Sequence, residues 1–126
     1  MTDFERKKVI PDTNCVLEIL NAENTDAYGK QSSIKVEVVE GEHAGHVFTD
    51  YCSRDENTGR VRQGTKLWSV LEAALGLDFD ERYVNLNAAL AALEGERIMA
   101  RVTQTKTGSR NKLEHGTIGP VRKDAA

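Results

Sequence analysis

Apolar and polar residues alternate along the first half of the chain. Ile34, Val36 and Val38 occupy every second position of one run, which is the period of a strand with one buried face. Two other runs are rich in β-forming residues and are bounded by polar or turn residues. We therefore expect strands at residues 14–20, 33–40 and 46–53, with the glycine-bearing loop 41–45 joining the last two into a hairpin.

The hydrophobic period changes after the third expected strand. From Leu67 to Leu75, apolar residues recur at i, i+3, i+4, i+7 and i+8, as they do on one face of a helix. Thr65 is a suitable N-cap, and Gly76 is suited to the position just beyond the last turn. The pattern predicts an amphipathic helix over residues 65–75.

A second helical segment is expected at residues 85–93. The period of two then returns: residues 97–105 alternate and predict a further strand, and a weak last strand is expected at residues 111–118. The inward face of the strand at 97–105 is expected to hold Ile98, Ala100 and Val102, and its outward face Arg97, Met99, Arg101 and Thr103.

Five strands with a helix between the third and the fourth predict a mainly β fold. This order is that of the OB barrel, a five-stranded barrel in which the helix covers one open end. A chain of 126 residues fits one domain. We expect a single OB-fold domain over residues 1–126, with its core at about 12–119 and flexible termini.

The two cysteines, Cys15 and Cys52, each interrupt an apolar strand. Two buried, unpaired thiols in a reducing compartment fit this pattern better than a lone disulfide. No apolar run approaches the roughly 18–20 residues that span a bilayer, and no apolar segment follows the charged N-terminus as in a signal peptide. We expect a cytoplasmic protein that makes no membrane contact.

Charge is distributed unevenly along the chain, whose net charge is −3. From Glu72 to Glu96 there are six acidic residues and one basic residue. From Arg97 to Lys112 there are five basic residues and no acidic one. An acidic protein can thus carry one basic face, and that local face is what a phosphate backbone meets.

Packing and turn residues from about Asn14 to Gly119 form a recognisable set of segments. These segments are the opening strand, Ile34–Phe48, Leu67–Gly76, Leu93–Gly95 and Thr107–Asn111. Together they resemble a family of phage- and prophage-encoded OB-fold domains. The resemblance implies an OB fold that binds single-stranded DNA in replication or recombination, with other phage replication or recombination proteins as partners. If the protein is phage-encoded, its compartment is the host cytoplasm.

Binding of single strands requires cations along the phosphates and aromatic faces on which bases stack. In an OB barrel, the first loop, the second and third strands and the last loop border one cleft. An alternative interpretation of cations at these places is ordinary solvated surface charge. The basic residues expected at the cleft are Lys30, Lys35, Arg101, Lys106, Arg110 and Lys112, with Arg54, Arg60 and Arg62 after the third strand.

Phe48 and Tyr51, on the expected hairpin, are the best stacking candidates among the aromatic residues. Strand alternation places them on opposite faces, so at least one of them is expected in the core. Tyr28 lies in a loop that could close over the cleft. Trp68 lies beside the apolar stripe of the helix and is expected to pack that helix against the barrel.

No set of residues predicts catalysis. His43, His46 and Cys52 lie near one another, but zinc requires a fourth ligand that this neighbourhood lacks. The glycines in residues 41–45 and 59–64 do not follow the pattern of a phosphate-binding loop. We expect no enzyme activity, no metal and no cofactor. A two-metal nuclease site is not expected either, because its candidate carboxylates have no basic or histidine partner beside them. These carboxylates are Glu72, Asp78, Asp80 and Glu81.

The sequence thus predicts an accessory protein that binds single-stranded DNA through backbone capture and base stacking. The alternative is an OB-type adaptor or structural module that binds protein, and the acidic stretch 72–96 favours it. A homo-oligomer is compatible with either function. Salt dependence separates the two, because nucleic-acid binding weakens steeply with salt.

Overall fold

The computed structural model describes residues 8–26 and 29–121, and the expected flexible ends lie largely outside these ranges. The fold is mainly β, as predicted, and the three helices found in these ranges all lie between the third and fourth strands. The strands are β1 (Thr13–Thr25), β2 (Gln31–Val38), β3 (Val47–Ser53), β4 (Arg97–Gln104), β5 (Asn111–Leu113) and β6 (Gly119–Pro120). The helices are α1 (Lys66–Leu75), α2 (Phe79–Arg82) and α3 (Leu86–Ala92).

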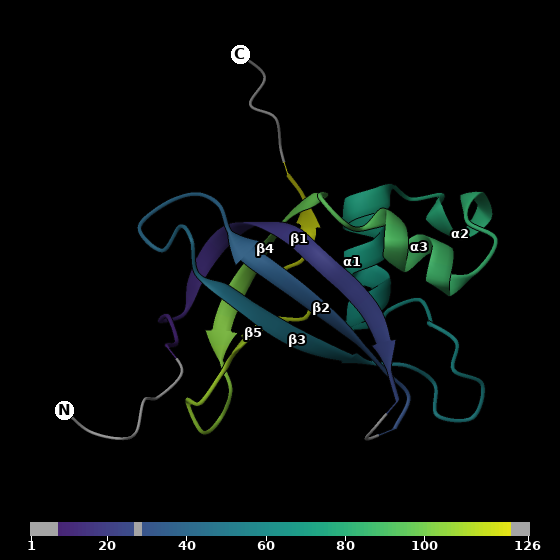
Figure 1. Cartoon of the computed structure of the whole chain (residues 1–126), viewed down its shortest axis with the longest axis horizontal. Coiled ribbons are helices and arrows are strands. Elements are labelled where there is room, and N and C mark those ends of the chain that lie inside the picture. The colour runs from purple at the N-terminus through teal and green to yellow at the C-terminus, as the bar shows by residue number, and fades with distance from the viewer. Residues whose placement is uncertain (1–7, 27–28, 122–126) are drawn as a thin grey trace, which may run out of the picture.

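The six strands of the described chain form one antiparallel sheet. Its order is β3-β2-β1-β4-β5, with β6 beside β4. β1 joins the two halves, because its residues 13–18 pair with β4 and its residues 17–25 pair with β2. The register shifts between Ile19 and Asn21, and a bulge of this kind bends a strand. In Figure 1, β1, β2 and β3 run side by side while β4 crosses behind them.

The buried face of the sheet is built from apolar residues at every second position. Ile34, Val36 and Val38 of β2 are at most 1% exposed, so the predicted inward face of this strand is confirmed. Burial at this spacing removes apolar side chains from water and leaves the alternating polar positions outside. The same alternation buries Cys15, Leu17 and Ile19 on β1 and Ile98, Ala100 and Val102 on β4.

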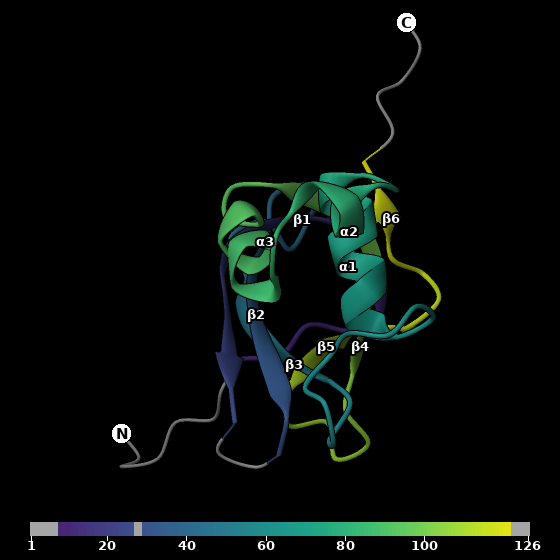
Figure 2. The same ribbon diagram turned by 90° about the vertical axis from the view of Figure 1, so that its right-hand side faces the viewer.

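Helix α1 packs its apolar stripe against the sheet through Leu67, Val70 and Leu71. The predicted caps are both present: the Thr65 hydroxyl accepts the N–H of Trp68 at 3.4 Å, and Gly76 leaves the helix with a φ of 105°. In Figures 1 and 2 the three helices gather at one end of the sheet, and the β4–β5 turn lies at the opposite end. No helix of the described chain has the length and apolar character needed to cross a bilayer.

The sheet is not closed into the predicted five-stranded barrel. It has six strands, and no backbone ladder joins β3 to β5 in the part of the chain that is described. The weak last strand was expected over residues 111–118, but β5 ends at Leu113 and leaves few backbone groups for a ladder. The buried side chain of Asp50 on β3 accepts the N–H of Leu113 at 3.0 Å instead. A side chain therefore bridges the two sheet edges where a ladder was expected.

Two smaller expectations also need correction. Thr103 was expected to face outward, but it is 8% exposed. The segment around Ile10 and strand β5 lie over this end of β4, where the Gln104 and Asn111 amides both donate to the Ile10 carbonyl. The short helix α2 was not expected, because its single buried residue, Phe79, gives no periodic pattern in the sequence.

Candidate nucleic-acid interface

A groove runs beside β3 at the turn between β4 and β5. Its volume is about 440 Å³. The described residues that line it include three cations and two aromatic side chains but no aspartate or glutamate. We call it the basic groove. Its lining residues are Lys8, Val9, Lys35, Val47, Phe48, Thr49, Tyr51, Ser109, Arg110 and Asn111.

The β2–β3 hairpin positions Lys35 and Tyr51 on the same side of the sheet. Lys35 lies opposite Thr49 in the register, and Tyr51 lies opposite Ser33. Lys35 and Tyr51 are therefore diagonal neighbours, within reach of one another's long side chains. Tyr51 is 46% exposed and Lys35 is exposed, so the ring and the ammonium are both available to a ligand.

Arg110 reaches the groove from the turn that precedes β5. The N–H of Thr105 donates to the carbonyl of Arg110 at 2.9 Å and closes this turn, with Gly108 in the left-handed region at a φ of 69°. The Arg110 guanidinium carbon lies 5.9 Å from the centroid of the Tyr51 ring. A cation at this distance from an aromatic face is attracted to it. The contact joins the turn to β3 and brings a positive charge beside an aromatic surface.

Phe48 forms part of the groove although it lies on the other face of β3. It is half-buried, packs against the core and stacks with His46 at a centroid distance of 5.8 Å. Nε2 of His46 donates to Oδ1 of the buried Asn111 at 2.9 Å. Because β3 is at the edge of the sheet order, side chains from both of its faces reach the space beside it. Phe48 and Tyr51 thus line the same groove although they lie on opposite faces of the strand.

Arg54 belongs to the interior of the loop structure and not to the basic groove. Its side chain is 5% exposed and pairs with Asp26. Its guanidinium also donates to the carbonyls of Gly59 and Gln31, at 2.9 and 3.1 Å. A buried guanidinium with these partners holds the β1–β2 and β3–α1 connections together.

Two other predicted cations are held by carboxylates outside the groove. Lys30 pairs with Asp26 at 3.6 Å. Arg62 pairs with Asp55 at 2.7 Å. The pKa of Asp55 is lowered chiefly by the backbone N–H of Thr58, then by the Thr58 hydroxyl, with a smaller contribution from Arg62.

The remaining predicted cations do not line the basic groove. Arg101 is half-buried, and the others are exposed. None of them forms an ion pair with a residue in the described ranges. Tyr28 lies outside the described residues. The cations in this group are Arg60, Arg101, Lys106 and Lys112.

Sequence reasoning missed Lys8 and Asn111 as groove residues. Lys8 comes to the groove because Ile10 docks on β5: the N–H of Ile10 donates to Oδ1 of Asn111 at 3.0 Å. The two residues are separated by 101 positions, so no local pattern joins them. The basic run Arg6-Lys-Lys8 was the one signal in the sequence that could have pointed to Lys8.

The predicted unpaired, buried cysteines are confirmed. Cys15 and Cys52 are free and are 7% and 2% exposed. Burial, with a further contribution from the negative charge of Asp50, raises the pKa of the Cys52 thiol to about 12, and Lys66 opposes this shift. The thiol is therefore neutral at ordinary pH and a poor nucleophile. Among the described residues, no three His, Cys, Asp or Glu side chains gather as a metal site requires.

The basic groove can hold an extended anionic ligand with flat apolar groups. Three cations offer charge to phosphates, and Phe48 and Tyr51 offer rings to bases. The hydroxyls of Ser109 and Thr49 add polar groups along the same surface, whereas the amide of Asn111 is buried and bonded to Ile10, Thr103 and His46. Compared with protein-family models, with curated proteins and with solved structures, the chain gave no match.

Proposed function

We propose that the protein binds single-stranded DNA in the basic groove, as an accessory protein of phage or prophage replication or recombination. The observation that carries the proposal is the composition of the groove. The groove is lined by the cations Lys8, Lys35 and Arg110 together with the rings of Phe48 and Tyr51, and none of the described lining residues is acidic. Cations and accessible aromatic rings are the two components that sequence-tolerant binding of single strands uses.

The net charge of −3 does not oppose this proposal, because the charges are separated in space. The basic groove lies at the β4–β5 turn, and the acidic stretch 72–96 contributes to the helical end of the molecule (Figure 1). A phosphate backbone responds to the local potential, which falls off over about 8–10 Å at moderate salt. The three groove cations therefore attract phosphates in spite of the overall charge.

The proposed fold is an OB-type barrel that is not fully closed, because no backbone ladder joins its edge strands β3 and β5 within the described ranges. We call the junction between these two strands the seam. The support is the sheet order, in which β1 pairs with both β2 and β4, and the placement of α1 between β3 and β4. The Asp50–Leu113 hydrogen bond and the His46–Asn111 hydrogen bond bring β5 against β3, where an OB barrel would close. In that fold, the basic groove corresponds to the surface beside the second and third strands and the last loop.

The proposed activity is binding without chemistry, in the cytoplasm of the cell that makes the protein. The described groove residues include no carboxylate, cysteine or histidine, which are the usual bases and nucleophiles. The polar groups that they offer to a ligand are hydroxyls, two ammonium groups and a guanidinium. This set suits contacts to phosphates and bases.

The test is a titration of fluorescently labelled oligo(dT) with the full chain, followed by anisotropy at several salt concentrations. Three phosphate contacts predict a logarithmic salt slope of about −2, from about 0.7 per contact on a single strand. Duplex DNA of the same length is expected to bind more weakly, because its bases cannot stack on Phe48 or Tyr51. Absence of binding at about 50 mM salt, or tighter binding of the duplex, would contradict the proposal.

A further inference from the structure

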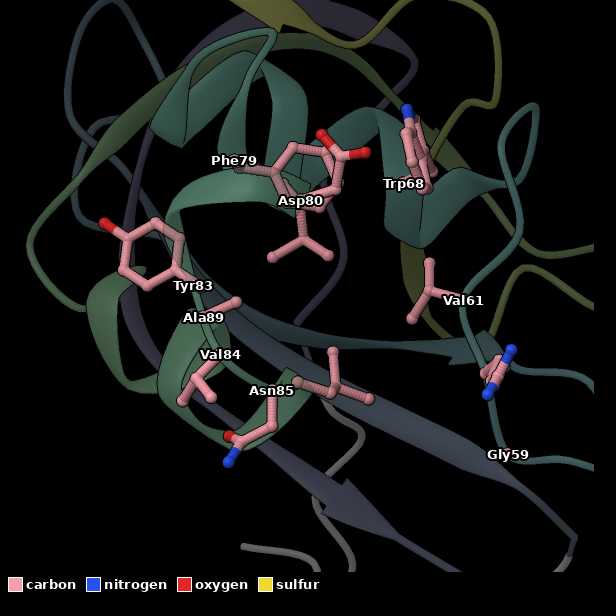
Figure 3. A pocket seen from close by; sticks show the side chains of 12 residues that line it. Gly59, Val61, Trp68, Phe79, Asp80, Tyr83, Val84, Asn85 and Ala89 are labelled. Atoms are coloured by element: carbon pink, nitrogen blue, oxygen red, sulfur yellow. The ribbon is translucent and has the colours of Figure 1, made fainter.

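A second cavity, distinct from the basic groove, lies among the three helices and residues 59–61. Its volume is about 530 Å³. Figure 3 shows Trp68, Phe79 and Tyr83 around this space, with Val84 at its edge and Gly59 and Val61 on the opposite side. We call it the helical pocket. It shares no lining residue with the basic groove.

The aromatic wall of the helical pocket is held in place before any ligand arrives. The Trp68 indole N–H donates to Glu72 Oε2 at 3.2 Å, one turn along α1. The Trp68 and Phe79 rings meet edge to face, with their centroids 4.8 Å apart. Phe79 is 5% exposed, and the Arg82 guanidinium lies over Tyr83 at 5.4 Å. A preformed apolar surface costs a ligand little ordering on binding.

Val84 is the most exposed large apolar side chain in the described chain, at 90%, and it lines the helical pocket. It lies between α2 and α3, where Asn85 caps the second of these helices. A partner that enters the pocket would cover this side chain and remove its apolar surface from water. Leu77, which is 80% exposed, does not line the pocket and provides an internal comparison.

The charges beside the helical pocket select the chemistry of the occupant. Residues 72–96 contain six carboxylates and one cation, Arg82, which already pairs with Asp78 at 3.0 Å. Asp80 lines the pocket and Glu81 follows it, and neither forms an ion pair with a described residue. The one cation among the described lining residues, Arg60, comes from the loop between β3 and α1. The α2 side therefore repels phosphates and attracts a basic group.

We propose that the helical pocket docks a short segment of a partner protein. The segment places one large apolar side chain against Trp68, Phe79 and Val84, and a lysine or arginine beside it faces Asp80 and Glu81. The helices and the β4–β5 turn lie at opposite ends of the sheet (Figures 1 and 2), so a partner and a ligand of the basic groove can be bound together. This inference does not depend on what the basic groove binds.

Trp68 is the only tryptophan in the chain, so its emission reports on the helical pocket alone. The experiment selects short random peptides displayed on phage against the full chain, and then titrates synthetic tryptophan-free versions while Trp68 emission is recorded. We expect the selected peptides to combine a leucine, isoleucine or phenylalanine with lysine or arginine, and to change the emission on binding. Peptides in which glutamate replaces the basic residues are expected to bind at least about tenfold more weakly.

Two variants and one matched control locate the binding surface. Val84→Asn is expected to weaken the selected peptides about fivefold, because an apolar side chain at the pocket edge is lost. The charge-neutralising pair Asp80→Asn and Glu81→Gln is expected to weaken them about threefold and to reduce their salt dependence. Leu77→Asn removes another highly exposed apolar side chain, outside the pocket, and should leave binding unchanged.

Several results would overturn the inference. Selection that enriches no peptide, or only peptides that Leu77→Asn weakens as much as Val84→Asn does, would exclude the pocket as a docking site. A change in Trp68 emission on adding oligo(dT), suppressed by Val84→Asn, would assign the pocket to a nucleobase. Emission that depends on protein concentration, together with a dimer in analytical ultracentrifugation, would assign it to a second copy of this chain.

Discussion

The carboxylate of Asp50 on β3 accepts the backbone N–H of Leu113 on β5 at 3.0 Å. The same oxygen accepts a hydrogen bond from the Lys66 ammonium at 2.8 Å, so one side chain joins both sheet edges to the start of α1. The Asp50 side chain is 9% exposed, which makes these contacts stronger than surface ones. Asp50 thus links β3 to β5 at the seam through its side chain, whereas backbone hydrogen bonds link the neighbouring strands elsewhere in the sheet.

Replacing Asp50 with alanine is expected to lower the free energy of unfolding by about 2–4 kcal/mol. The substitution leaves the Leu113 N–H and the Lys66 ammonium without their partner at a poorly solvated place. Urea denaturation of the wild type and the variant measures this loss. The matched control is Asp78→Ala, which removes an exposed pair with Arg82 and should cost less than about 1 kcal/mol. Equal losses in the two variants would contradict the role of Asp50 as the bridge of the seam.

The double substitution Lys35→Ala and Arg110→Ala is expected to weaken oligo(dT) binding and to flatten its logarithmic salt slope by about 1.4, or about 0.7 for each lost phosphate contact. Stability should change by less than about 0.5 kcal/mol for each exposed side chain. Anisotropy titrations at several salt concentrations measure both quantities. The pair Lys106→Ala and Lys112→Ala changes the net charge equally but lies outside the basic groove. An equal effect from this control pair would move the binding surface away from the groove.

Tyr51→Ala is expected to weaken oligo(dT) binding by about 1–3 kcal/mol without changing the salt slope, because it removes a stacking surface and no charge. The ring is 46% exposed, so folding should be little affected. Tyr51→Phe keeps the ring and its contact with Arg110, and it should bind as the wild type does. If Tyr51→Phe were as weak as Tyr51→Ala, the hydroxyl and not the ring face would be the contact.

The buried Cys52 thiol should make the protein less stable at high pH. Its pKa is raised from the ordinary 9.0 to about 12, so between these values the unfolded chain loses a proton that the folded chain keeps. Stability contributed by this group is present below pH 9 and falls as the pH rises, by at most about 1.4 kcal/mol per pH unit. Urea denaturation between pH 8 and 11 should therefore show a steeper decline for the wild type than for Cys52→Ala. Parallel declines would show that the thiol does not contribute.

Much of the fold could be predicted from local patterns. The period-two run at Ile34, Val36 and Val38 and the N-cap at Thr65 each depend on neighbours within a few residues. Such patterns predict structure because the side-chain spacing of a strand and of a helix is the same in every protein. Lys35, Tyr51 and Arg110, which were expected at one cleft, line one groove in the structure, because strand order follows from the same patterns. What that groove binds stays a prediction.

The seam, the groove and the fate of individual charges were decided by contacts between distant residues. Lys35 lies in β2 and Arg54 directly follows β3, and both are cations. Arg54 is nevertheless buried against Asp26, while Lys35 lines the basic groove. Nothing local distinguishes them, because burial of a charge depends on whether partners from other segments surround it. Lys8 likewise joins the groove through Ile10 and Asn111, whose hydrogen bond spans 101 positions. The sequence by itself determined which segments became strands and helices, and the tertiary structure decided which edges met and which charges remained free, because hydrophobic periodicity is a local property whereas edge contacts and charge pairing are not.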